Sequence, residues 1–197
     1  MKTKLSLLSL LLLLASCAST PNYSIYPAID PVNINTKETK WLVDEPTLIA
    51  VSNSFKHDAM TYYKEHLSKN FGEVSTVSDL GLPSLKDMVE KDPDVLDLYY
   101  DRTKYDYVIE TKIHLTRNDI NGIQIEKYDS IFNEMTLEIK VYNLKNKELV
   151  FKRDYYFSES AKVGLVNADG FVNSCVNGGI KAFGSSYTWN KKAKQSI

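Results

Sequence analysis

The sequence predicts one α+β domain, mixed α/β in the order of its elements, with a mostly antiparallel sheet and helices on one face. Residues 105–116 alternate apolar and polar side chains, and two further alternating stretches joined by a short turn follow them. This pattern predicts a long antiparallel hairpin in the C-terminal half. Residues 55–71 and 171–183 carry apolar side chains at helical spacing, which predicts two amphipathic helices, the second of them closing the fold. At 197 residues the chain has room for one ordinary domain.

The first half of the domain is expected to alternate strands and helices. Thr47 to Val51 is a short apolar run typical of a buried strand. Serine and asparagine at 52–54 can cap the helix over 55–71, and Gly72 can end it. Three further elements are expected: a strand over 73–77, a helical stretch from Pro83-Ser84, and another from Asp92-Pro93.

The second half changes period from helical to alternating. The strand over 105–116 has one apolar and one polar face, as in a sheet with one solvated side. After a loop at 118–122, the alternating stretches 131–141 and 149–157 flank the turn Lys145-Asn146-Lys147, so they are expected to pair as the hairpin.

The first residues form a targeting segment rather than part of the fold. A cationic start is followed by eleven residues, Leu5 to Ala15, of which eight are leucine. This run is shorter than the about 20 residues that a membrane-spanning helix needs, and the pattern is typical of a secretory signal peptide.

The end of that segment, Leu14-Ala15-Ser16-Cys17, resembles the lipobox of bacterial lipoproteins. The resemblance implies cleavage between Ser16 and Cys17, a diacylglycerol on the Cys17 sulfur and a further acyl chain, such as palmitate, on its amino group. Several acyl chains give stable anchoring, whereas one chain holds a protein only marginally. Residue 18 is alanine rather than aspartate, which by the same resemblance favours the outer membrane and a periplasm-facing domain. The alternative is an ordinary signal peptide with an incidental cysteine.

These observations divide the chain into four parts. Residues 1–16 are the signal peptide, 17–45 the lipidated cysteine and a tether, 46–188 the globular domain, and 189–197 a basic tail. The tether lacks an apolar period before Trp41, and a flexible chain of its length would reach about 30 Å. Packing of Tyr26 to Ile34 on the domain as an extended arm stays open.

The domain also resembles a group of bacterial envelope domains: the curli secretion-channel subunit, the lipoprotein activators of penicillin-binding proteins, and the amino-terminal domain of the Tol-system propeller protein. The resemblance rests on the strand and capped helix over 48–67 and on Tyr105-Asp106-Tyr107-Val108. The hairpin turn departs from it, since Asn146-Lys147-Glu148 lacks the usual glycine. It implies an accessory or assembly role, and no catalytic residues are carried over.

Composition argues against several kinds of site. The net charge of −1 provides no basic field for nucleic acid. Two cysteines and three histidines are too few for a disulfide framework or a structural zinc site. Cys175 lies on the apolar stripe of the last helix and is expected to be an inert core residue. His57 and His66 do not share a helix face, and His114 lies on the polar face of its strand. We expect no metal and no cofactor other than the lipid on Cys17.

Two groups of acidic residues invite a functional interpretation. Asp92, Asp94 and Asp97 suggest calcium, but capping and the helix dipole explain them better. A cell-wall hydrolase would need two converging carboxylates, for which the sequence offers Asp129, Glu134 and Asp154.

A row of small residues follows the last helix: Gly170, Ser174, Gly178 and Ala182. Such a row allows another backbone to approach closely. Close packing of the helix on its own sheet and self-association of two chains are both open interpretations.

The first interpretation of function is a non-enzymatic, membrane-anchored envelope lipoprotein whose domain binds a protein partner, or a second copy, in support of assembly. The alternatives are the envelope hydrolase and a carrier of small ligands or lipids, which would need an apolar cavity between sheet and helices.

Overall fold

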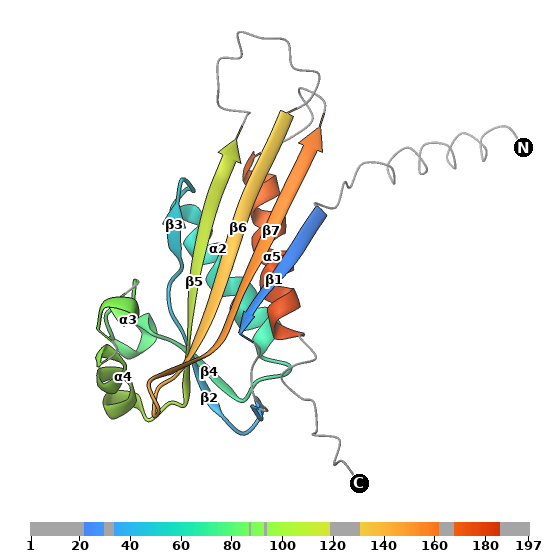
Figure 1. Ribbon diagram of the computed structural model, residues 1–197. Coiled ribbons are helices and arrows are strands. Elements are labelled where there is room, and N and C mark those ends of the chain that lie inside the picture. Colours follow the sequence, from blue (N-terminus) through green and yellow to red (C-terminus); the bar gives the residue numbers. More distant parts are fainter. Residues whose placement is uncertain are drawn as a thin grey trace, which may run out of the picture.

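The computed structural model describes residues 22–29, 34–86, 88–92, 94–118, 131–161 and 168–185. Figure 1 shows one sheet with helices packed against it. The elements in chain order are β1 (Asn22–Ile29), β2 (Lys40–Val43), β3 (Thr47–Ile49), α2 (Ser54–Leu67), β4 (Glu73–Thr76), η1 (Ser78–Leu80), α3 (Met88–Lys91), α4 (Val95–Thr103), β5 (Tyr107–Asn118), β6 (Ile131–Asn143), β7 (Glu148–Ala161) and α5 (Ala168–Gly184).

The sheet combines an antiparallel part with a parallel part. Its strand order is β1-β7-β6-β5-β2-β4, and β3 pairs with β5 beyond the end of β2. The pairs β1–β7, β7–β6 and β6–β5 are antiparallel. The pairs β5–β2, β5–β3 and β2–β4 are parallel. The predicted α+β class is confirmed, and so is the long hairpin, which β6 and β7 form.

The main core lies between the sheet and the two long helices, α2 and α5, which cover one face (Figure 1). Aromatic residues fill its centre: the Phe183 ring lies 5.3 Å from Phe151 and 6.3 Å from Tyr63. These side chains are almost completely buried.

A second, smaller core lies on the opposite face, at the end of the sheet where α3 and α4 pack. It takes the intervening residues of the same strands, such as Leu42 of β2, Val108 of β5 and Tyr142 of β6. The expectation of helices on one face therefore holds for α2 and α5, while α3 and α4 cover part of the face that was expected to be solvated.

The strand that begins at β2 is interrupted before β3. β2 pairs with Tyr107–Ile109 of β5 and β3 pairs with Lys112–His114, so Asp44, Glu45 and Pro46 bridge the gap between them. The backbone N–H of Asp44 still donates to the carbonyl of Ile109, at 2.9 Å. This interruption carries the Asp44 side chain into the second core.

The helix α2 ends at Leu67, four residues before the expected end. The chain then turns, and the Phe71 ring packs edge-on against Trp41, with centroids 4.8 Å apart. Gly72 serves a close approach: its N–H donates to the Thr36 carbonyl at 2.7 Å, and a Cβ atom there would lie 2.5 Å from the Thr39 carbonyl oxygen.

The N-terminal part of the chain differs from the expected tether over 17–45. β1 pairs with β7 from Asn22 opposite Ser158 to Ile29 opposite Lys152, and β2 lies within the sheet. The sheet therefore begins at Asn22 rather than after residue 45, and the extended-arm interpretation is right for residues 26–29. An edge strand tolerates proline and needs little apolar surface, which explains why no apolar period marked it.

Candidate functional site

The predicted lipidation site lies outside the described residues, which begin at Asn22. Cys17 and Ser16 therefore remain predictions from the sequence. The structure changes their setting, because only residues 18–21 separate Cys17 from the first strand. Within the described part of the chain, no helix is long and apolar enough to cross a membrane.

The row of small residues on α5 faces solvent for most of its length. Gly170, Ser174 and Gly178 are exposed and Ala182 is half-buried. A Cβ atom at Gly178 would meet nothing within 4 Å, whereas one at Gly179 would collide with Leu137 of β6. The close packing on the sheet thus depends on Gly179, which the sequence pattern missed, and self-association through the row stays a prediction.

Cys175 lies in the main core, as predicted, between α5 and the sheet. Burial raises the pKa of its thiol, and the nearby charge of Glu159 raises it further. A thiol of this kind is not a nucleophile at neutral pH.

The histidines do not converge. His66 hydrogen-bonds to the amide oxygen of Asn177 at 2.7 Å and so joins α2 to α5. His57 is exposed on α2, and His114 lies on β5 opposite Thr136. In the described residues, no group of three histidine, cysteine, aspartate or glutamate side chains is placed to hold a metal ion.

The acidic residues at the start of α4 bind a lysine. Lys147, in the β6–β7 turn, places its Nζ 3.0 Å from Asp94 and 2.8 Å from Asp97, while Asp92 accepts a hydrogen bond from the Asp94 N–H. These ion pairs raise the pKa of Lys147. Asp94, not Asp92, stands at the N-cap of α4, and its side chain makes no capping hydrogen bond. The expected cap by Asp92 is therefore not confirmed, and Asp94 and Asp97 are engaged by Lys147.

The carboxylates considered for a hydrolase are not brought together. Glu134 lies opposite Ser158, and Asp154 lies opposite Glu138. Glu134 and Asp154 are therefore offset by four residues, or about 13 Å, along the strands. Paired catalytic carboxylates in glycosidases lie about 5–9.5 Å apart. Asp129 lies outside the described residues.

The face of β5, β6 and β7 opposite α2 and α5 carries two cross-strand rows that mix acidic and basic residues. Glu110, Lys140 and Lys152 form one cross-strand row. In the next row, Lys112 and Asp154 flank Glu138. The Glu138 carboxylate lies 3.1 Å from the Lys140 Nζ and 2.8 Å from the Lys152 Nζ.

The charges of the two rows sum to zero, because they contain three acidic and three basic side chains. Burial by itself would raise the pKa of Glu138, but hydrogen bonds and charges from Lys152 and Lys140 outweigh it and lower the pKa. A face with equal numbers of acidic and basic side chains supplies no field of one sign for a charged ligand.

A buried carboxylate, Asp44, holds the second core together. Its Oδ2 accepts hydrogen bonds from the Leu85 N–H at 2.7 Å and the Ser84 hydroxyl at 3.0 Å, and its Oδ1 accepts one from the Glu45 N–H. Burial raises the pKa of Asp44 to about 6 against these hydrogen bonds, and the charge of Glu110 adds to the rise. Because Asp44 is only 1% exposed, it joins the segment before α3 to the sheet and is not accessible to a substrate.

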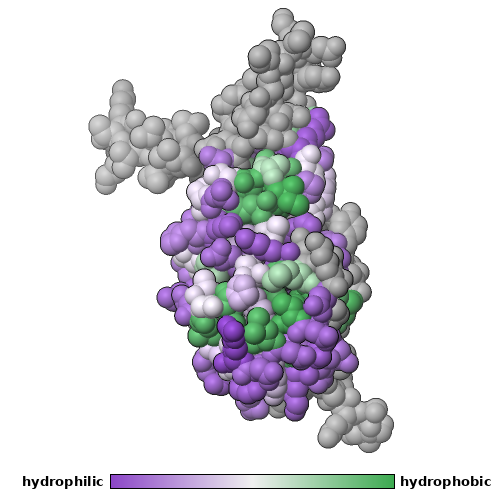
Figure 2. Space-filling model, turned by 90° about the vertical axis from the view of Figure 1, so that its left-hand side faces the viewer, coloured by the Kyte–Doolittle hydropathy of each residue, from purple (hydrophilic) through white to green (hydrophobic). Residues whose placement is uncertain are grey.

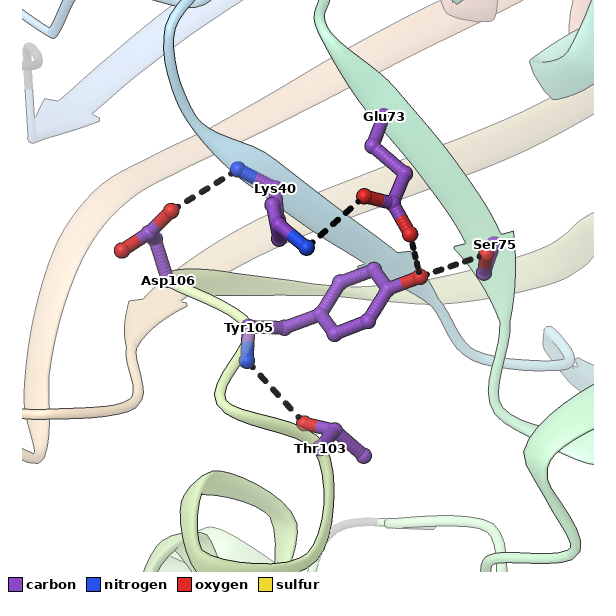
Figure 3. Close-up of polar contacts among 6 residues, drawn as sticks. All are labelled: Lys40, Glu73, Ser75, Thr103, Tyr105 and Asp106. Atoms are coloured by element: carbon purple, nitrogen blue, oxygen red, sulfur yellow. Dashed lines mark hydrogen bonds and ion pairs between the residues drawn. The ribbon is translucent and has the colours of Figure 1, made fainter.

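A polar network closes the end of the sheet where β2, β4 and β5 begin (Figure 3). Glu73 is held at both oxygens, by the Lys40 Nζ at 2.9 Å and the Tyr105 hydroxyl at 2.6 Å, and Ser75 contacts the same hydroxyl at 2.7 Å. The Lys40 N–H donates to Asp106 at 2.8 Å. Hydrogen bonds from Tyr105 and Lys40 lower the pKa of Glu73. The network fixes the edge strand β4 to its neighbours.

A groove of about 560 Å³ lies between α2 and β4, near these elements. Buried Val43 and Tyr63 lie at its base. Further lining residues come from both sides: Met60, Thr61 and Lys64 from α2, and Val74, Ser75 and Thr76 from β4.

The groove runs beside an open strand edge. The Val77 N–H donates to Val43 of β2, so by the alternation of a strand the backbone groups of Val74 and Thr76 point away from β2. Among the described strands, β4 pairs only with β2. The groove and this edge together can receive an extended polypeptide segment.

The flank beside the groove is mixed in character. Figure 2 shows two apolar areas, one at the height of β3 and one at the height of α3 and α4, with hydrophilic residues between them. Partly buried Leu48 of β3 and Leu98 of α4 belong to the rims of the two cores.

Comparisons with known proteins complete the description. Neither a protein-family model nor a curated protein matches the chain. Among solved structures, the PelC dodecamer of Paraburkholderia phytofirmans is similar with 11% identity and a TM-score of 0.48, over 81% of this chain and 96% of that one. Lipoprotein GNA1162 of Neisseria meningitidis has 12% identity and a TM-score of 0.47, over 75% and 99%. A minor lipoprotein of Acinetobacter baumannii has 13% identity and a TM-score of 0.39, over 75% and 94%. Several similar structures are thus bacterial lipoproteins, but likeness at this level carries no argument about activity.

Proposed function

We propose that the chain is a bacterial envelope lipoprotein, anchored through acylated Cys17 in the outer membrane, whose periplasm-facing domain binds a partner protein and supports assembly without catalysis. The observation that carries the proposal is the motif Leu14-Ala15-Ser16-Cys17, placed directly ahead of a folded sheet domain. The acyl chains supply the membrane attachment that no described helix can provide.

The described side chains favour binding over chemistry. Cys175 and Asp44 are buried, and Glu138 is engaged in ion pairs. The groove between α2 and β4 offers an apolar base, polar walls and an unpaired strand edge. Backbone hydrogen bonds to such an edge provide affinity, and the groove selects the side chains.

The anchor is tested with Cys17→Ser. We expect the wild-type chain to carry acyl groups, measured by intact mass, and to fractionate with membranes, while Cys17→Ser carries none and is soluble. A mutant that stays in the membrane fraction would contradict the anchor.

The binding groove is tested by photocrosslinking in intact cells. Crosslinkers at Thr61 and Lys64, in the groove, are expected to capture the same protein, and one at exposed Asp101 of α4 is not. The substitution Thr61→Trp fills the groove and should abolish capture from Lys64. Capture that is equal from Asp101, or unaffected by Thr61→Trp, would sink the groove as the binding site.

A further inference from the structure

The short connection between Cys17 and β1 restricts how the domain can lie on a membrane. This step rests on the proposed acylation of Cys17. Five peptide steps separate Cys17 from Asn22, and each spans at most about 3.6 Å. The acylated residue therefore lies within about 18 Å of Asn22.

Asn22 lies near one end of the sheet. It pairs with Ser158 of β7, which pairs with Glu134 of β6, which in turn pairs with Arg117 of β5. β6 and β7 continue to the pair Ile131 and Ala161, three residues or about 10 Å farther. Cys17 can thus reach only about 8 Å beyond the end of these strands.

The opposite end of the sheet is out of reach. The β6–β7 turn at Leu144–Lys147 lies more than ten residues of β6 away from Ile131, which is about 40 Å. The bilayer that holds Cys17 therefore lies within reach of the end formed by the last residues of β5 and β7 and the first of β6, and of the flank beside β1. In Figure 1 the start of β1 lies beside the upper parts of β6 and β7.

The side chains at this end suit a lipid headgroup region. Phe132, beyond the level of Asn22, is 37% exposed. The Arg117 guanidinium lies 4.8 Å from the centre of its ring, and Arg117 is exposed. An exposed aromatic ring has its most favourable place at the boundary of headgroups and acyl chains, and a guanidinium binds phosphate through paired hydrogen bonds.

We infer that the domain stands end-on, with Phe132 and Arg117 in contact with the phospholipid surface that holds the Cys17 anchor. In this orientation the β6–β7 turn lies at the end of the domain farthest from the membrane. The α2–β4 groove then does not face the membrane. The occupant of the Phe132–Arg117 surface is the bilayer. Ile25 and Ile29 on the flank beside β1 are at least as exposed as Phe132, so the Arg117 charge beside the Phe132 ring, together with the short connection, favours the end over the flank.

Fluorescence quenching by lipids tests the orientation. The acylated full-length chain is reconstituted into vesicles of phosphatidylethanolamine and phosphatidylglycerol that contain lipid with a nitroxide in the headgroup. A polarity-sensitive dye is attached at Phe132→Cys, Ile29→Cys or Asn146→Cys, one at a time. The Cys17 sulfur is blocked by its lipid, and Cys175 is buried, so only the new thiol is labelled.

End-on contact predicts several-fold stronger quenching at position 132 than at positions 29 and 146. Quenching at 29 as strong as at 132 would show a side-on domain, and quenching at 132 no stronger than at 146 would show no contact. Either result overturns the inference. Insertion of twenty glycine and serine residues between Thr20 and Pro21 should lower quenching at 132, and an unchanged signal would refute the argument from length.

The anchor and the orientation fail in different ways. If the reconstituted chain does not float with vesicles and its mass shows no acyl groups, the proposed function fails and the orientation falls with it. If it floats but the labels show no preference for position 132, only the orientation fails.

Discussion

The buried carboxyl of Asp44 should make the protein less stable as the pH rises through weakly acidic values. In the folded chain burial raises the pKa of Asp44 from 3.8 to about 6, whereas in the unfolded chain it returns to its ordinary value. Between these two pH values the folded state binds more protons than the unfolded state. The stabilising contribution is thus complete below pH 3.8 and is lost as the pH rises to about 6.

The size of the effect follows from the change in pKa. A tenfold change in a proton dissociation constant is about 1.4 kcal/mol, so the move from 3.8 to about 6 corresponds to about 3 kcal/mol. Asp44→Asn removes this titration. An asparagine oxygen can still accept from Leu85 and Ser84, while the bond from the Glu45 N–H is lost, at a cost of about 1 kcal/mol that does not vary with pH.

The assay is urea unfolding of the wild type and Asp44→Asn at pH 3.5 and 7.5. The wild type should lose about 3 kcal/mol more than the mutant between the two pH values, because every other titrating group is common to both. Asp101→Asn, at an exposed position of α4, is the control and should follow the wild type. A pH dependence identical in wild type and Asp44→Asn would refute the reasoning.

Three further predictions concern packing, charge and reactivity. Gly179→Ala forces a Cβ atom into a leucine of β6 and should destabilise the fold by about 1–3 kcal/mol. Gly178→Ala places its Cβ atom where no other atom lies within 4 Å and should stabilise the fold by about 1 kcal/mol. Thermal unfolding measures both changes, and a shift of both melting temperatures in the same direction would contradict this prediction. Glu138→Gln leaves two lysines without their acid and should cost about 1–3 kcal/mol at pH 7. The pKa of Glu138 is lowered in the fold, so its contribution is present above the ordinary carboxyl value and fades as the pH falls through the folded pKa. Urea titrations should therefore show a larger cost of Glu138→Gln at pH 7 than at pH 3. Cys175 should react with a thiol reagent only as fast as the domain opens, so modification that is insensitive to urea below the unfolding transition would speak against its burial.

The sequence predicts those strands and helices in which a single buried face sets the spacing of the apolar residues. The alternation in β5, β6 and β7 and the helical spacing in α2 and α5 each reflect a single apolar contact surface, and all five elements are present. β1 was not predicted as a strand, because an edge strand with Pro27 shows no such alternation.

The second core was missed for a related reason. Val108 shares its face of β5 with Asp106, Glu110 and Lys112, so that face was expected to be solvated. Instead, Val108 is completely buried in the second core, where α3 and α4 pack. No local signal shows that the backbone of Leu85 meets Asp44, since the two are 41 residues apart. The same holds for the groove, which α2 and β4 create only through their packing. A short motif is enough to predict the anchor at Cys17, whereas surfaces made by distant residues needed the structure.

The four residues of β2 serve two cores at once, and this has a consequence for how the sequence can change over evolutionary time. Trp41 and Val43 enter the large core while Leu42 enters the small one. Losing or gaining one codon between Lys40 and Val43 would turn each side chain to the wrong side and damage both cores together. Related genes should therefore vary in length mainly in the loops and keep a fixed residue count across this strand.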